Sequence, residues 1–170
     1  MPTYDLTKPR QVDFATVEKD FEIILERFLS NQNLLKLLYY TDADCLSKED
    51  ITSADDLIAI SDQNIRITPY FDIPENKGSF IILTFDDFSP NATNPAYMDN
   101  FIVIDILCPK GTWSMNDYMQ RPFRIMHEVQ KLLDKQKLNG IGVVNFLGAK
   151  LLNLGEIAGY QAIYSVINDV

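Results

Sequence analysis

FIVIDILCP, residues 101–109, is the most apolar stretch in the sequence and is rich in β-branched side chains. Asn100 precedes this stretch, and Lys110 and Gly111 follow its terminal proline. A short apolar run bounded by turn-forming residues is typical of a strand that is buried on both faces, or nearly so. We therefore expect the core of the protein to form around this strand.

Segments on both sides of this strand complete the expected core. SFIILTF, residues 79–85, predicts a partner strand, and residues 119–135 predict an amphipathic helix with Arg121 and Arg124 on its polar face. Apolar residues at three- and four-residue spacing predict another helix that begins at Asp13 and runs to about residue 29. The sequence further predicts a short helix over 32–40 and a helix that begins at the hydroxyl-x-x-acid pattern of residues 47–50. It also predicts an edge strand over 65–71. Two antiparallel strands are expected over 141–147 and 159–168, joined by a long connection.

This order of elements predicts an α+β fold. We expect a mostly antiparallel sheet of about four to five strands, packed against the N-terminal helix and the second amphipathic helix. With 170 residues, the chain is long enough for one domain with a real core, so residues 13–170 are expected to form a single domain after an extended arm over residues 1–12.

Targeting and redox features are sparse. No apolar run approaches the roughly 18 residues of a membrane span, and the N-terminus has no apolar signal core, so we expect the chain to be made in the cytoplasm without membrane contact. Cys45 and Cys108 are too few for a disulfide framework, and we expect both to be reduced thiols.

The net charge of −9 is concentrated in the middle of the chain. Between Asp42 and Asp105 lie 13 acidic and three basic residues, and the remaining positions are nearly balanced. Gripping nucleic acid requires a basic face because the phosphate backbone is negative, so this composition argues against such a binder. The acidic segment is interpreted either as an ordinary solvated surface or as a surface that lets DNA slide past. The second interpretation applies only if the protein lines a channel.

Few groups suit catalysis or metal binding. His127 is the only histidine, so a Cys–His pair would require Cys45 or Cys108 to approach it in space. One histidine and two cysteines are too few for a zinc site, and the Asp42-x-Asp44 pattern lacks the glycine and the final glutamate of a calcium loop. We expect no cofactor, no metal and no catalytic residue.

Four aspartates could still meet near one end of the central strands: Asp86, Asp87, Asp99 and Asp105. Paired carboxylates can perform acid–base chemistry or hold a metal ion. The first three are better explained as residues of a long hairpin connection over 86–100. Asp105 interrupts an apolar strand, so it should be paired, exposed at an edge, or at an interface, because burying an isolated charge is costly.

The C-terminal half resembles the small tail-terminator and tail-completion (head–tail joining, neck) proteins of tailed bacteriophages. The resemblance runs from Asn100 to Asn168 and rests on the order of its elements. These are the strand FIVIDILCP, an aromatic loop, the helix RPFRIMHEVQKLLD, the strand NGIGVVNFLGAK and the closing strand GYQAIYSVIND. The apolar second helix and the acidic segment over 41–62 depart from that pattern.

The resemblance implies a virion protein that forms a ring, commonly hexameric, which caps the tail tube and docks it to head-completion or connector proteins. DNA would pass through the lumen without sequence-specific binding. The loops over 86–100 and 110–118 and the N-terminal arm are the implied ring contacts, with Phe88, Tyr97, Met98, Trp113 and Tyr118 at the interface. An acidic middle would suit a channel, with Asp55, Asp56 and Asp62 facing the DNA.

Two other classes remain open. A small enzyme would use carboxylates around Asp86, Asp87 and Asp105, and single Asp to Asn changes would then abolish turnover without unfolding the protein. An acidic adaptor or inhibitor would be a monomer or dimer that binds a basic partner in a salt-sensitive way.

Overall fold

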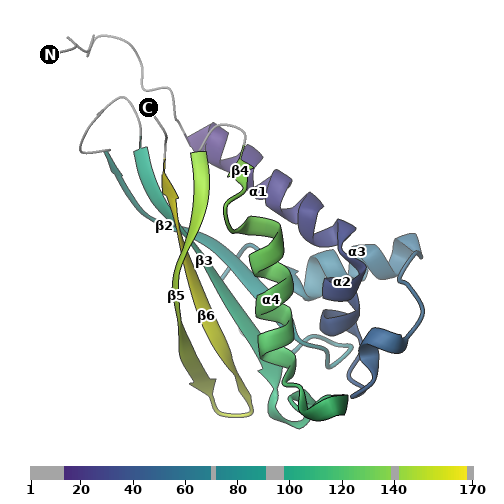
Figure 1. Cartoon of the computed structure of the whole chain (residues 1–170). Helices are drawn as coiled ribbons and strands as arrows, with labels where there is room; N and C mark the ends of the chain where they lie inside the picture. Colours follow the sequence, from purple (N-terminus) through teal and green to yellow (C-terminus); the bar gives the residue numbers. More distant parts are fainter. Residues whose placement is uncertain (1–13, 70–71, 91–97, 139–141, 168–170) are drawn as a thin grey trace, which may run out of the picture.

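The computed structural model describes residues 14–69, 72–90, 98–138 and 142–167, and it shows one twisted sheet with helices on one face (Figure 1). The sheet has six strands in the order β1-β2-β3-β6-β5-β4. The strands are β1 (Ile65–Arg66), β2 (Phe80–Pro90), β3 (Met98–Pro109), β4 (Lys137–Leu138), β5 (Gly142–Leu154) and β6 (Ile157–Ile167). The main helices are α1 (Phe14–Ser30), α2 (Gln32–Tyr39), α3 (Ala54–Gln63) and α4 (Arg121–Leu133). Only β1 pairs in parallel, so the predicted α+β class with a mostly antiparallel sheet is confirmed.

The stretch at residues 101–109 forms most of β3, which lies in the middle of the sheet between β2 and β6. Ile102, Ile104 and Ile106 are fully buried in the layer between the sheet and the helices. The opposite face of β3 is only half-buried at Val103 and Asp105. Burial on both faces is therefore realised only toward the end of the strand, where Leu107 packs in a small second cluster with Phe80, Ile82 and Ile157.

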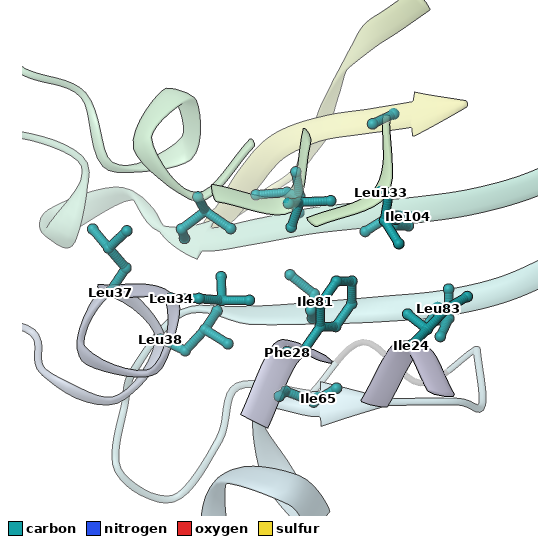
Figure 2. Packing of buried hydrophobic residues seen from close by; sticks show 14 of the residues in the cluster. Ile24, Phe28, Leu34, Leu37, Leu38, Ile65, Ile81, Leu83, Ile104 and Leu133 are labelled. Atoms are coloured by element: carbon teal, nitrogen blue, oxygen red, sulfur yellow. The ribbon is translucent and has the colours of Figure 1, made fainter. Parts of the chain in front are cut away.

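The main core lies between the sheet and α1, α2 and α4, and it holds the apolar faces that the sequence predicted. In Figure 2, Ile24 and Phe28 of α1 lie against Ile81 and Leu83 of β2. Leu34, Leu37 and Leu38 of α2 close one end of this layer. Burying these side chains stabilises the fold by roughly 1.5–3 kcal/mol each on transfer grounds.

Three expected elements differ from the structure. β1 has two residues instead of seven, and α3 begins after the N-cap Ser53, whose side chain accepts from the Asp56 amide, rather than at residues 47–50. The expected connection at 148–158 is instead mostly strand, because β5 continues to Leu154 and meets β6 at a two-residue turn over Gly155 and Glu156. Gly155 has a φ of 77°, a conformation that favours glycine.

The predicted hairpin connection over 86–100 is shorter in the structure, because β2 extends to Pro90 and β3 begins at Met98. The arm over residues 1–12, Asp13 and the middle of that connection lie outside the described residues. Among the helices that the structure describes, none is long and apolar enough to cross a membrane.

Candidate assembly interface

The outer edge of β5 is paired only at its beginning. β4 pairs with Gly142 and Val143, the Val144 amide donates to the Gln136 carbonyl at 3.0 Å, and the Phe146 amide donates to Asp134 Oδ1 at 2.9 Å. From Leu147 to Leu154, no strand in the described part of the chain pairs with this edge. We call residues 147–154 the free edge of β5.

Apolar side chains crowd this free edge. Leu147 is 58% exposed, Leu151 61% and Leu154 45%. Lys150 is the only charged residue in the run, and the only bulge lies at its start, between Phe146 and Gly148. Natural proteins shield unpaired strand edges with charges, prolines and bulges, because an open edge is a template for pairing with another chain. A long, apolar and weakly shielded edge indicates a surface that a partner covers.

Aromatic residues extend this surface onto the helix-facing side of the β5–β6 hairpin. Phe123 of α4 contacts Tyr160 of β6 with ring centroids 5.0 Å apart, and Tyr160 lies opposite Leu151 in the strand register. Phe146 contacts Tyr164 at 5.4 Å. Phe123 and Phe146 are themselves partly exposed, so apolar surface continues from α4 to the free edge.

The opposite side of the sheet has a second open edge. β1 pairs only with Ile81 and Ile82, so beyond Ile82 the outer edge of β2 has no strand partner in the described residues. This edge is acidic, because Asp86 and Asp87 are exposed. Asp87 has a φ of 52° at a bulge where the pairing with β3 shifts register, and the bulge limits the regular edge to the residues before it.

The two edges carry opposite charge. Between Lys131 and Lys150 the chain has four lysines and one aspartate, and this segment covers the β4–β5 side of the molecule. Asp86, Asp87 and Asp99 are the charged residues of the described β2–β3 hairpin beyond the core. Opposite charge on two edges of one sheet favours contact between different edges of two molecules over contact between like edges.

The predicted interface residues occupy different environments. Trp113 is half-buried, and its Nε1 donates to the carbonyls of Cys108 and Ala158, both at 3.3 Å, so it packs down onto the sheet. Tyr118 is fully exposed and has a φ of 59°, which is unusual for a residue with a bulky side chain. Phe88 is half-buried within β2. Met98 begins β3, and Tyr97 lies outside the described residues.

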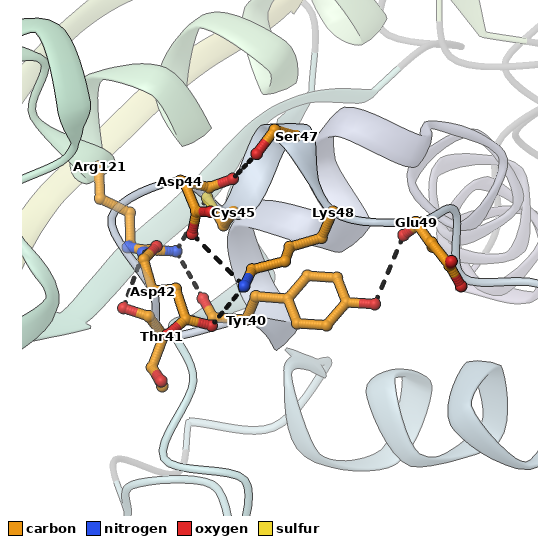
Figure 3. A network of polar contacts seen from close by, with 9 residues as sticks. All are labelled: Tyr40, Thr41, Asp42, Asp44, Cys45, Ser47, Lys48, Glu49 and Arg121. Atoms are coloured by element: carbon orange, nitrogen blue, oxygen red, sulfur yellow. Dashed lines mark hydrogen bonds and ion pairs between the residues drawn. The ribbon is translucent and has the colours of Figure 1, made fainter.

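A buried arginine holds the loop that carries Trp113 and Tyr118. Figure 3 shows the Arg121 guanidinium among the residues that follow α2. It donates to the main-chain oxygens of Leu37, Tyr40, Thr41, Asp42 and Thr112 and to Cys45 Sγ. Arg121 is 0% exposed, so its assignment to the polar face of the helix was wrong. Arg121 precedes the buried Ile125 by four residues, and this spacing is the signal that could have placed it on the buried face.

The three acidic residues predicted to face a channel lie on α3. Asp55 and Asp62 are exposed, and Asp56 is half-buried and accepts a hydrogen bond from the Tyr39 hydroxyl at 3.1 Å. This contact raises the pKa of Tyr39, chiefly through the hydrogen bond to the carboxylate. Asp55 and Asp56 lie in the first turn of α3, where negative charge is favourable against the helix dipole.

Of the candidate carboxylates, Asp87 and Asp99 line one hollow, but Asp105 is not brought to them. Asp86 lies opposite Phe101, four positions from Asp105 along β3, so the two are separated by about 13 Å at the usual rise of a strand. Asp105 accepts from Gln161 Nε2 at 2.7 Å, as expected for a paired residue, and burial raises its pKa. His127 is exposed on α4. Within the described residues, no three His, Cys, Asp or Glu side chains are placed to hold a metal ion.

Both cysteines are free thiols in buried positions. Burial raises the pKa of Cys108 to about 12, which disfavours the reactive thiolate. Burial also raises the pKa of Cys45, against the opposing effect of Arg121. Neither thiol is therefore activated as a nucleophile.

The free edge of β5 was not predicted, because residues 148–158 read as a connection in the sequence. Gly155 and Glu156 between apolar residues are a two-residue hairpin signal that could have revealed the two long strands. The weak strand propensity of Gly148, Ala149 and Lys150 hid this hairpin, and pairing with β6 overrides that propensity.

Comparison with known protein families gives one match, in which the family model of YomW covers residues 31–166. Comparisons with curated proteins and with solved structures gave no match. The matched segment begins just before α2 and ends near the end of β6, so it includes both open edges and the loop held by Arg121. Because the match covers well over half of the chain, the protein belongs to the YomW family, a phage-like family of Bacillus prophage proteins, which indicates a phage origin.

Proposed function

We propose that this protein is a structural component of the virion, a tail-terminator or neck protein that assembles into a closed hexameric ring at the head–tail junction. The observation that carries the proposal is the free edge of β5, which exposes an apolar strand edge in a protein of phage origin. A soluble chain with such an edge needs a partner to cover it, and repeated copies of the same chain are the partners that a ring supplies.

The proposed ring caps the tail tube and contacts head-completion or connector proteins, and DNA passes through its lumen. The acidic surface of α3 suits such a lumen, because like charge keeps the DNA from binding to the wall. We assign Asp55, Asp56 and Asp62 to this wall. Replacing all three by asparagine should slow genome ejection while rings still form, and unchanged ejection kinetics would remove this assignment.

The experiment that tests the ring is native mass spectrometry of the purified protein over a concentration series, with negative-stain images of the same samples. The expected result is one closed oligomer with a central hole. A strict monomer at every concentration, together with its absence from purified virions, would overturn the proposal. A monomer that binds a basic protein in a salt-sensitive way would favour the acidic adaptor instead.

A further inference from the structure

We propose that neighbouring subunits join through their sheets, with the free edge of β5 in one subunit pairing antiparallel to the outer edge of β2 in the next copy, and with Lys150 opposite Asp86. This inference rests on the proposed function, because it names the contact that would close the ring. It uses two edges that are both open in the described chain and that carry opposite charge.

The strand directions permit this pairing. β2 and β3, β3 and β6, and β6 and β5 each pair antiparallel, so β5 runs opposite to β2 within one subunit. In a ring whose axis lies along the strands, the next copy keeps the same orientation. Its β2 therefore runs antiparallel to the β5 that it meets, and the sheet continues from one subunit to the next.

The main-chain hydrogen-bonding groups of the two edges also match when Lys150 lies opposite Asp86. The Ile81 amide points outward and donates to the Asn64 carbonyl at 2.8 Å, so by alternation Leu83 and Phe85 also direct their main-chain groups outward. On β5, the main-chain groups of Val144 and Phe146 point outward. The bulge adds one residue, so beyond it the main-chain groups of Ala149 and Leu151 point outward. Placing Lys150 opposite Asp86 sets Leu151 opposite Phe85, so two outward-pointing residues face each other as a hydrogen-bonded pair.

The side chains also match in this register. Lys150 and Asp86 both lie on the sheet face that the helices leave uncovered, and both are exposed. Leu151 and Phe85 lie on the helix-facing side, where Phe85 already contacts Phe21 edge-to-face at 4.6 Å. A cross-strand pair of opposite charge and an adjacent apolar pair are the contacts that stabilise antiparallel strands.

The pairing ends where β1 begins. With Leu151 opposite Phe85, the β5 strand of the neighbour runs on past Leu83 toward β1. Leu154 falls opposite Ile82, where Arg66 of β1 already pairs, so the new ladder spans residues 150–153 of β5 and residues 83–86 of β2.

A second copy that presents β2 fits better than one that presents β5. Pairing β5 with itself would bring together two edges that each carry Lys150 and the lysines of the α4–β4 segment. Like charges in opposite positions destabilise a strand pair. It would also give an isolated two-fold dimer, whereas pairing β5 with β2 leaves one open edge of each kind on every subunit and can continue until a ring closes.

Charge reversal with rescue tests the pairing. Lys150→Glu and Asp86→Lys each place like charges in opposite positions, and each should raise the concentration of half-assembly by about fivefold or more. The double variant restores an opposite pair and should recover assembly. Asp86→Asn removes the charge but keeps a local hydrogen bond. Its side-chain oxygen can still accept from the main-chain amide of Asp87, as Asp86 Oδ1 does at 2.8 Å. Glu49→Lys, at an exposed acid in the segment before α3, is the control for net charge.

The readout is sedimentation velocity over a concentration series, with thermal unfolding to check that each variant is folded. The strand pairing would be overturned if rings form normally in both single variants. It would also be overturned if the single variants assemble weakly and the double variant does not recover assembly. In both cases the proposal of a ring would still stand. A wild-type chain that never assembles, alone or in virions, would instead overturn the proposed function. If the protein forms discrete dimers and Asp86→Lys does not affect them, the partner of β5 is the β5 edge of a second copy and not β2.

Discussion

Arg121 donates a hydrogen bond to the main-chain oxygen of Asp42 at 2.6 Å, although 79 positions separate the two residues in the chain. The same guanidinium also reaches carbonyls at the end of α2 and in the loop that follows β3. One side chain thereby joins the start of α4, the acidic segment and the aromatic loop. The five donors of a guanidinium, fixed in one plane, are suited to such a cluster of carbonyl acceptors.

Replacing this arginine should destabilise the fold. Arg121→Met keeps much of the buried volume but leaves several carbonyls without a donor, and we expect the free energy of unfolding to fall by roughly 3–5 kcal/mol. Urea unfolding followed by the fluorescence of Trp113, the single tryptophan, measures this change close to the site. Arg124→Met on the same helix is the matched control, because Arg124 is only half-buried. Equal losses in the two variants would contradict the role given to Arg121.

A second stability prediction concerns the contact between β6 and β3. A Cβ added to Gly159 would lie 1.7 Å from the Ile106 carbonyl oxygen, which is part of the neighbouring backbone and cannot move aside cheaply. Gly159→Ala should therefore lower the free energy of unfolding by about 3 kcal/mol. Gly111→Ala is the control, because a Cβ there meets nothing within 4 Å. A Gly159→Ala midpoint in urea equal to that of the control would show that the strands separate more easily than we expect.

The fold class could be predicted from the sequence because its strongest signals are local. The apolar run at 101–109 and the helical periodicity in α1 and α4 each determine an element without reference to the rest of the chain. The free edge of β5 could not be found in this way. Lys150 and Asn153 are strand residues only because β6 pairs with them, and pairing between strands is not visible in local propensity.

The candidate site shows the same limit. An aromatic residue in a loop predicts a contact but does not say which way the side chain points, so Trp113 and Tyr118 were grouped together. In the structure Trp113 packs onto the sheet, whereas Tyr118 is fully exposed. The difference arises from main-chain hydrogen bonds around Arg121, which connect segments far apart in the sequence.

A buried carboxyl group on α1 predicts an unusual pH dependence. Asp20 is fully buried, and neither side-chain oxygen has a hydrogen-bond partner within the described residues. Burial raises the pKa of Asp20 from 3.8 to about 7. Because the folded state holds this proton more tightly than the unfolded chain, its contribution to stability is fully present below about pH 4 and is lost as the pH rises to about 7.

Asp20→Asn removes this titration and keeps a side chain of similar size. Relative to the variant, the wild-type protein should lose stability between pH 4 and pH 7 by up to roughly 1.4 kcal/mol per pH unit, and the two curves should run parallel above pH 8. Urea unfolding of both proteins at each pH gives the difference directly. Parallel curves across the whole range would mean that Asp20 is hydrated or paired in solution.

The last prediction concerns the apolar character of the free edge of β5. Leu151→Lys places a charge on an exposed strand edge, which is the device that natural proteins use to prevent edge pairing, so it should weaken assembly without unfolding the subunit. Ile58→Lys is the matched control, because Ile58 on α3 is 60% exposed and Leu151 is 61% exposed. We expect the concentration of half-assembly in sedimentation velocity to rise at least about tenfold for Leu151→Lys, equivalent to about 1.4 kcal/mol, and to change little for Ile58→Lys. If both variants assemble like the wild-type protein, the ring contact lies elsewhere. If Ile58→Lys alone fails to assemble, that contact includes α3, and the acidic residues beside it would lie between subunits instead of facing DNA.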